Sequence, residues 1–174
     1  LGLQQGLAVE FRTMVFSDVA SQLVEVKAVD GAYPLKGVLE LEPSNLNVDT
    51  GSAFIQQRLF NLLNVSAGDS LFIGEAELEL KGRLVQEPDV GFNIGGLQPR
   101  VLISLRDLER TQVLQPGSRA KWRYYFAGSE TSLQAFDSWI EDRVNSSQRY
   151  QGVQGGRPAI ASAIDRSESY LVLA

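Results

Sequence analysis

Apolar and polar residues alternate at the start of the chain. From Gly6 to Phe16 every second residue is apolar or β-branched, and a second apolar run from Leu23 to Val29 follows the polar turn Ser17–Ser21. A period of two is typical of β-strands. The pattern therefore predicts a β-hairpin over residues 7–29.

The middle of the chain mixes short strands with one helix. Val38–Glu42 predicts a strand that Pro43 stops, and Ser52 is a candidate N-cap for a helix that Asn64 would close. The apolar positions of this predicted helix recur at helical spacing and are Ile55, Leu59, Leu62 and Leu63.

A second hairpin is predicted after that helix. The turn at Gly68-Asp69 leads into one strand, Glu75–Leu80 alternates strictly, and Gly82 is a candidate β-bulge in the second strand. Val101–Leu105 predicts a further strand that leads into one helical turn at Arg106–Arg110.

The last third predicts a strand at Ala120–Ala127 and then a helix capped by Ser129 that ends near Asn145. A short extended piece near Tyr150 precedes a last helix, which Pro158 opens and which runs to the end with Ile160, Ile164 and Leu171 on one face. Strands and helices that do not alternate regularly indicate an α+β fold.

Composition excludes several classes of enzyme. The 174 residues are 44% hydrophobic and 21% charged, which is typical of one globular domain or two small ones. The chain has no Cys and no His, so thiolate nucleophiles, Ser-His-Asp triads and zinc sites built on those residues are excluded. The net charge of −5 argues against binding that depends on nucleic-acid phosphates.

Two charged stretches are candidates for a binding or catalytic site. Glu75, Glu77 and Glu79 share one face of a predicted strand, where they could bind a hard cation or act as acid-base groups, but alternation with apolar residues favours a solvated strand face. Lys121–Phe126 interleaves cations with aromatic residues as single-strand nucleic-acid binders do, but strand alternation favours a core face for Trp122, Tyr124 and Phe126. No catalytic, metal-binding or cofactor-binding residue is assigned.

Glu87–Pro99 is predicted to be a long loop because it has three glycines and two prolines and no periodicity. Its Gly91–Gly96 stretch lacks the Gly-Lys-Ser/Thr ending of a phosphate-binding loop. Phe92 and Ile94 would lie near the loop tip, where they are candidates for contact with a partner or a lipid.

Three stretches in this order carry a family resemblance: VKAVDGAYPLKGVLEL, RLFNLLNVSAGDSLFIGEAELELKGRLVQEPD and PGSRAKWRYYFAG. Together they resemble the periplasmic portion of bacterial MacB/FtsX-type ABC transporter permeases. The resemblance covers the chain from about Gly6 to its end and is closest to the predicted permeases associated with lysophospholipase-type esterases. The matched motifs mark folds and turns rather than catalytic groups.

The resemblance implies a ferredoxin-like, porter-type subdomain with a small strand-rich subdomain inserted into it. The porter part would be residues 1–32 and 118–174, without the family's first strand and helix, and the insert would be residues 33–117 with one helix. Tyr33-Pro34 would make the first crossing between them. The chain opens without Met and ends in an apolar run, so it reads as a piece of a longer protein whose last helix leads into a membrane span.

By the same resemblance, the chain would be a periplasmic domain of a bacterial inner-membrane protein, with no cofactor and no enzymatic activity of its own. A separate cytoplasmic ATPase would bind ATP, and the domain would relay movement of the membrane helices to a periplasmic partner or to extraction of lipid or other hydrophobic molecules. The partner could be a lysophospholipase-like esterase, and the parent protein could be dimeric. Two alternatives stay open: a stand-alone domain that binds lipid or another apolar ligand, and a carboxylate-dependent hydrolase.

Overall fold

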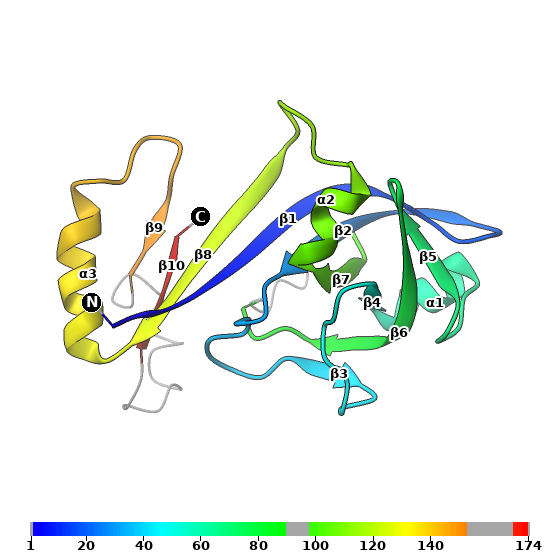
Figure 1. Cartoon of the computed structure of the whole chain (residues 1–174), viewed down its shortest axis with the longest axis horizontal. Helices are drawn as coiled ribbons and strands as arrows, with labels where there is room; N and C mark the ends of the chain where they lie inside the picture. Colours follow the sequence, from blue (N-terminus) through cyan, green and yellow to red (C-terminus); the bar gives the residue numbers. More distant parts are fainter. Residues whose placement is uncertain (1, 90–97, 153–168, 174) are drawn as a thin grey trace.

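The computed structural model describes residues 2–89, 98–152 and 169–173, and it has the α+β fold that the sequence predicts (Figure 1). The strands are β1 (Gln4–Phe16), β2 (Ser21–Val29), β3 (Glu40–Glu42), β4 (Ser52–Ile55), β5 (Ser70–Ile73), β6 (Ala76–Gln86), β7 (Arg100–Ser104), β8 (Ala120–Gly128), β9 (Tyr150–Gln151) and β10 (Ser169–Leu173). The helices are α1 (Gln57–Leu63), the 3-10 turn η1 (Leu105–Asp107), α2 (Leu108–Thr111) and α3 (Glu130–Glu141). None of the helices in these ranges is long and apolar enough to cross a membrane.

Both predicted hairpins are confirmed. β1 and β2 pair antiparallel from Ala8 opposite Val29 to Phe16 opposite Ser21, and β5 and β6 pair around the turn before Ala76. Gly82 lies at an irregularity in the pairing of β6 with β4, as expected for a bulge.

Six strands close into a small barrel. Around it β1 pairs with β2, β2 with β7, β7 with β4, β4 with β6, β6 with β5, and β5 again with β1. The pairs β2–β7 and β4–β6 are parallel and the others are antiparallel. Closure leaves the six strands of the ring without a long unpaired edge.

The barrel interior is the main hydrophobic core. Its residues alternate along the strands, as in Val9, Phe11 and Val15 of β1, and α1 adds Leu59 and Leu63 to the same cluster. The outer face of β2, β7 and β4 is covered by the segment between β2 and β4, which contributes Tyr33, Leu35, Leu39, Leu46 and Val48. Both faces of β4 and β7 are therefore buried, which explains their continuous apolar runs.

A second part of the sheet extends from the barrel through β1. The first half of β1 pairs with β8, β8 pairs with β10, and β10 pairs with β9. Helix α3 covers this part with Leu133, Phe136 and Ile140, which pack against Phe126. Figure 1 shows β1 and β8 running side by side from the end with α3 toward the barrel. The two long strands therefore belong to both parts of the fold.

The predicted start of the first helix is wrong. Ser52–Ile55 forms β4, all four residues are buried between β6 and β7, and the helix begins after Gln56. A short apolar run cannot be assigned to strand or helix by its period alone, and here pairing on both sides decides. The predicted end is confirmed, because Asn64 has the left-handed conformation (φ 51°, ψ 53°) of a helix-ending residue.

The helix predicted to run to the end of the chain is also wrong at its end. Ser169–Leu173 is strand β10, which pairs with β8 from Gly128 to Tyr124. The free edge of β8 offers hydrogen-bonding partners that outweigh the helical spacing of Leu171 with the residues before it. Pro158, Ile160 and Ile164 lie outside the described residues. The helix capped by Ser129 is confirmed, but it ends at Glu141 rather than near Asn145.

Candidate functional site

Lys27 on β2 is the centre of a buried ionic cluster. Its side chain is 1% exposed, and its Nζ donates hydrogen bonds to both carboxylate oxygens of Asp89 (2.6 and 2.7 Å) and to the Tyr33 hydroxyl (2.9 Å). The same nitrogen lies 4.4 Å from the centre of the Tyr33 ring and 3.3 Å from Glu87. Burial of an ammonium group is tolerated only with such pairing.

Two tyrosine hydroxyls complete the surroundings of Asp89. Tyr33 donates to Oδ1 at 2.5 Å, and Tyr125 of β8 donates a short hydrogen bond to Oδ2. Asp89 therefore accepts from three residues that each lie far from it in the sequence, at separations of 62, 56 and 36 residues. Charge-assisted hydrogen bonds of this kind are roughly twice as strong as neutral ones.

Arg100, the first residue of β7, is the second cation of the cluster. Its guanidinium forms a bidentate salt bridge with Glu87 (2.6 and 3.2 Å) and donates a hydrogen bond to Glu25 (2.8 Å). Glu10 of β1 lies 3.5 Å from Arg100 and 3.2 Å from Arg123 of β8. The cluster thus joins β1, β2, β7 and β8 to the residues that follow β6.

Burial and charge shift several of these groups. Burial alone would raise the pKa of Asp89, but the charge of Lys27 and the hydrogen bonds from Lys27, Tyr125 and Tyr33 hold it below its ordinary value. Burial, with the charge of Asp89 and the hydrogen bond to it added, raises the pKa of both Tyr33 and Tyr125. Burial alone would lower the pKa of Arg100, but its hydrogen bond to Glu87 and that carboxylate's charge raise it.

These shifts decide what the cluster can do chemically. Asp89 is held ionised and the two tyrosines are held neutral, so none of them is poised to exchange a proton near neutral pH. Across residues 2–89, 98–152 and 169–173 no group of three acidic side chains is placed to hold a metal ion. The geometry of the ionic cluster is suited to holding segments of the chain together.

The ionic cluster lies at the base of the predicted loop Glu87–Pro99. Glu87 and Asp89 precede its central part, Arg100 follows it, and the Pro99 carbonyl accepts from the Glu25 amide at 2.9 Å. The candidate contact residues Phe92 and Ile94, and the whole glycine-rich stretch 91–96, lie outside the described residues. Their role stays a prediction.

The predictions for the acidic stretch Glu75–Glu79 and the aromatic stretch Lys121–Phe126 have different outcomes. Glu75, Glu77 and Glu79 are exposed while Ala76, Leu78 and Leu80 are buried, so the solvated strand face is confirmed. The prediction of a core face for Trp122 and Tyr124 is wrong, because they are 46% and 43% exposed. The other face of β8 is partly covered by the ionic cluster, which buries Tyr125 instead.

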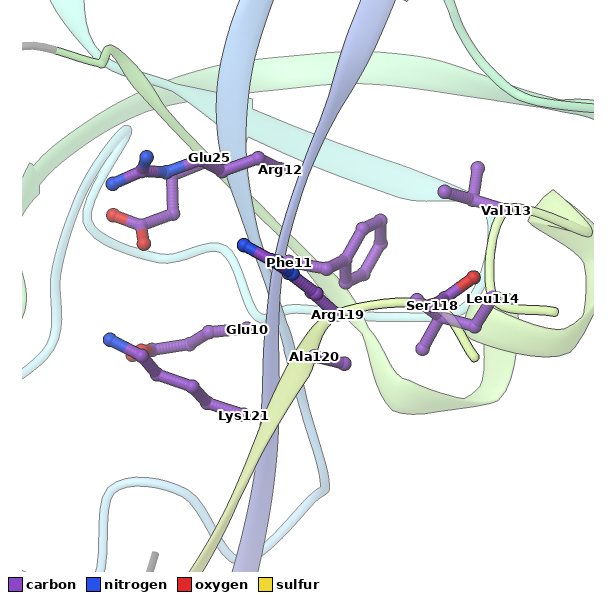
Figure 2. Close-up of a pocket in the computed structure, with 10 residues that line it drawn as sticks. All are labelled: Glu10, Phe11, Arg12, Glu25, Val113, Leu114, Ser118, Arg119, Ala120 and Lys121. Atoms are coloured by element: carbon purple, nitrogen blue, oxygen red, sulfur yellow. The ribbon is translucent and has the colours of Figure 1, made fainter. Parts of the chain in front are cut away.

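A hollow of about 710 Å³ lies beside the cluster (Figure 2). It is lined by Phe11, Val113, Leu114 and Ala120 on one side of β1 and by charged side chains on the other. A smaller hollow of about 370 Å³ shares Leu114 and is lined also by Leu105, Leu108, Glu109, Gln112 and Trp122.

The chain is similar to one segment of a much longer protein. It is 38% identical over 172 residues to the uncharacterized ABC transporter permease YbbP of Escherichia coli strain K12. The alignment covers 99% of this chain and 21% of that permease, so the chain spans about a fifth of its relative's length. No model of a known protein family matches the chain. The resemblance to part of an ABC transporter permease is thus confirmed, whereas its MacB/FtsX type stays a prediction.

Proposed function

We propose that the chain is the extracytoplasmic domain of a bacterial ABC transporter permease and that it relays ATP-driven movement of membrane helices to molecules in the periplasm. The observation that carries the proposal is the 38% identity over 99% of the chain to a segment of a permease. The absence of a membrane-spanning helix among the described residues is consistent with a part that lies outside the bilayer.

The two ends of the described chain support a mechanical role. Gln4 of β1 and Tyr170 of β10 both pair with Ala127 of β8, from opposite sides. Adjacent strands are about 4.8 Å apart, so Gln4 and Tyr170 lie about 10 Å from each other across β8. Figure 1 places both ends on the side of the molecule away from the β1–β2 tip. A pull on one end of this sheet would pass along β1 into the barrel.

The ionic cluster makes that path stiff. It ties β1, β2 and β8 together through Glu10, Lys27 and Tyr125, at the place where the strands pass from the α3 part into the barrel. Buried, fully paired networks favour one arrangement of their segments over others. The proposed porter part (residues 1–32 and 118–174) and inserted part (33–117) of a MacB-type domain meet at this cluster, although β1 and β2 also close the barrel.

The proposal extends to the whole protein. A cytoplasmic ABC ATPase would supply the movement and bind the ATP, and this domain would need no cofactor. The movement would serve docking of a periplasmic partner, for example a lysophospholipase-like esterase, or extraction of lipid and other hydrophobic molecules from the inner membrane.

The extracytoplasmic location can be tested by labelling. The chain has no Cys, so single cysteines report one position each. Val19→Cys, at a site 70% exposed on the β1–β2 turn, should react with a membrane-impermeant maleimide in cells whose outer membrane alone is permeabilised. Val24→Cys, fully buried in the barrel, is the matched control and should stay unlabelled. Labelling of Val19→Cys only after lysis of the inner membrane would contradict the proposal.

A stand-alone domain that binds an apolar ligand is the second candidate. The smaller hollow favours it, because Leu105, Leu108 and Leu114 line it together with the half-exposed Trp122. Native mass spectrometry of the purified chain with each major class of bacterial lipid tests this candidate. Absence of any bound lipid would count against it and would leave the permease proposal intact.

A further inference from the structure

Three cations line the larger hollow, and none of them forms an ion pair with a described residue. Arg12 on β1, Arg119 and Lys121 are all exposed, and among the described residues their side chains make no hydrogen bond and no ion pair. Figure 2 shows the nitrogen ends of all three on the same side of β1 as the carboxylates of Glu10 and Glu25. We call these three residues the cationic rim.

The nearby carboxylates are already engaged. Glu10 is 5% exposed and is shared among Lys27, Arg100 and Arg123, and Glu25 pairs with Arg100. The cluster and the rim together hold six cations, three in each, against the four carboxylates of the cluster. This face is therefore locally positive on a chain whose net charge is −5. A positive face on an otherwise acidic protein is suited to binding a negatively charged partner.

Exposed apolar residues continue the same face toward the hairpin tip. Met14 and Phe16 follow Arg12 at every second position of β1, and Leu23 of β2 lies opposite Met14. Their exposed fractions are 39%, 46% and 39%. Cation and apolar surface thus lie side by side along the outer face of β1 and β2.

The backbone of β1 is also open at this place. β8 pairs with β1 as far as Phe11, and β5 pairs with it from Val15 onward. Between these points, within the described residues, β1 has a strand partner only on the β2 side. An unpaired stretch of strand beside a hollow can accept hydrogen bonds from an extended peptide.

We propose that the cationic rim, with Met14, Phe16 and Leu23, docks a segment of a periplasmic protein that carries acidic side chains beside apolar ones. Charge complementarity selects this occupant, since among the described residues this face holds two more cations than carboxylates, and Met14, Phe16 and Leu23 beside it are partly exposed. The inference deepens the proposed docking of a periplasmic partner. It is tested on the chain alone, so its failure would leave the location and the relay proposed above untouched.

The test uses a short fluorescent peptide that alternates Glu and Leu. Fluorescence anisotropy should show that the chain binds it, and binding should weaken as salt is added. The variant Arg12→Gln/Arg119→Gln/Lys121→Gln should bind about tenfold more weakly. The control Lys81→Gln/Arg106→Gln/Arg149→Gln loses the same charge at exposed positions elsewhere and should bind within about twofold of the original chain. Circular dichroism checks that both variants are folded.

Three results would overturn the inference. The first is that the original chain does not bind the peptide at low salt. The second is that both variants lose affinity equally, which would mean that binding depends only on net charge. In the third, the rim variant loses binding to vesicles of phosphatidylglycerol while the peptide does not bind at all, which would make the face a membrane-contact surface.

Discussion

Two regions of the molecule carry several acidic residues and use them in opposite ways. Glu75, Glu77 and Glu79 point into solvent from β6 and the turn before it, where Glu79 meets Lys81 at 2.6 Å with both side chains about half exposed. Glu87 and Asp89 come only a few residues later in the sequence, yet they are almost completely buried against Lys27 and Arg100. Composition alone does not distinguish the two sets.

The difference lies in what surrounds the strands. The first set faces water, where ion pairs contribute little because solvent screens them. The second set is enclosed by β1, β2, β8 and the segment around Tyr33, so each charge depends on its partners. We infer that the buried set fixes the geometry of the domain and that the exposed set does not.

The largest expected effect is at Lys27. Lys27→Met removes the central cation and leaves Asp89, Glu87 and Glu10 facing one another, so unfolding free energy should fall by about 3–5 kcal/mol. Denaturant titration followed by tryptophan fluorescence measures it. Lys81→Met, which breaks the exposed pair, should cost less than about 1 kcal/mol. Equal losses in the two variants would remove the distinction between the regions.

Asp89→Asn should cost about 1.5–3 kcal/mol at neutral pH, the usual contribution of hydrogen bonds to a charged group. Because the folded pKa of Asp89 is depressed, its contribution is present above the unfolded pKa of about 3.9 and is lost as pH falls through the lower folded value. The stability gap between the original chain and the variant should therefore shrink below about pH 4.

Urea unfolding of Asp89→Asn at neutral and acid pH gives this gap. Asp18→Asn, at an exposed turn, is the control and should change stability by less than about 0.5 kcal/mol at either pH. A gap that stays constant into acid would mean that the charge of Asp89 does not contribute.

Tyr33 tests the buried region at alkaline pH. The raised pKa of Tyr33 and Tyr125 means that their contribution is present below the unfolded pKa of about 10 and is lost as pH rises beyond it. Both should ionise only as the chain unfolds, which tyrosinate absorbance and circular dichroism can follow together. Tyr33→Phe should remove one such late titration and cost about 1 kcal/mol. Tyr124→Phe, at a half-exposed site, should change unfolding free energy by less than about 0.5 kcal/mol.

The smallest expected effect is at the exposed carboxylates. The triple variant Glu75→Gln/Glu77→Gln/Glu79→Gln should change unfolding free energy by less than about 1 kcal/mol, because these side chains are solvated. Thermal unfolding of the variant is the measurement. A loss as large as that of Lys27→Met would show that the ladder has partners which its exposure does not reveal.

Sequence patterns predicted the elements whose period is set locally. The β1–β2 hairpin, the cap at Ser129 and the strand at Ala120–Ala127 follow from alternation and short-range hydrogen bonding. Strands β4 and β10 were missed because distant partners, β6 with β7 and β8, decide their conformation.

The ionic cluster was missed for a related reason. Its charged residues run from Glu10 to Arg123 and come from four strands and one loop, so no local spacing brings them together. One weak signal was present, namely that Glu25 and Lys27 occupy the second face of a strand whose first face is apolar. A covered second face would have predicted burial, but the cover from Tyr33 to Val48 is visible only in the fold.

The relay proposal rests on the domain moving as one stiff piece, and a pair of distances tests it most directly. Spin labels at Val19 on the β1–β2 turn and at the exposed Gln134 of α3 would report distances in the complete permease with its ATPase, in lipid nanodiscs. We expect the Val19–Gln134 distance to be the same with and without ATP, while the distance from Val19 to a label in a membrane helix changes. A nucleotide-dependent change within the domain, or no change in either distance, would contradict the account.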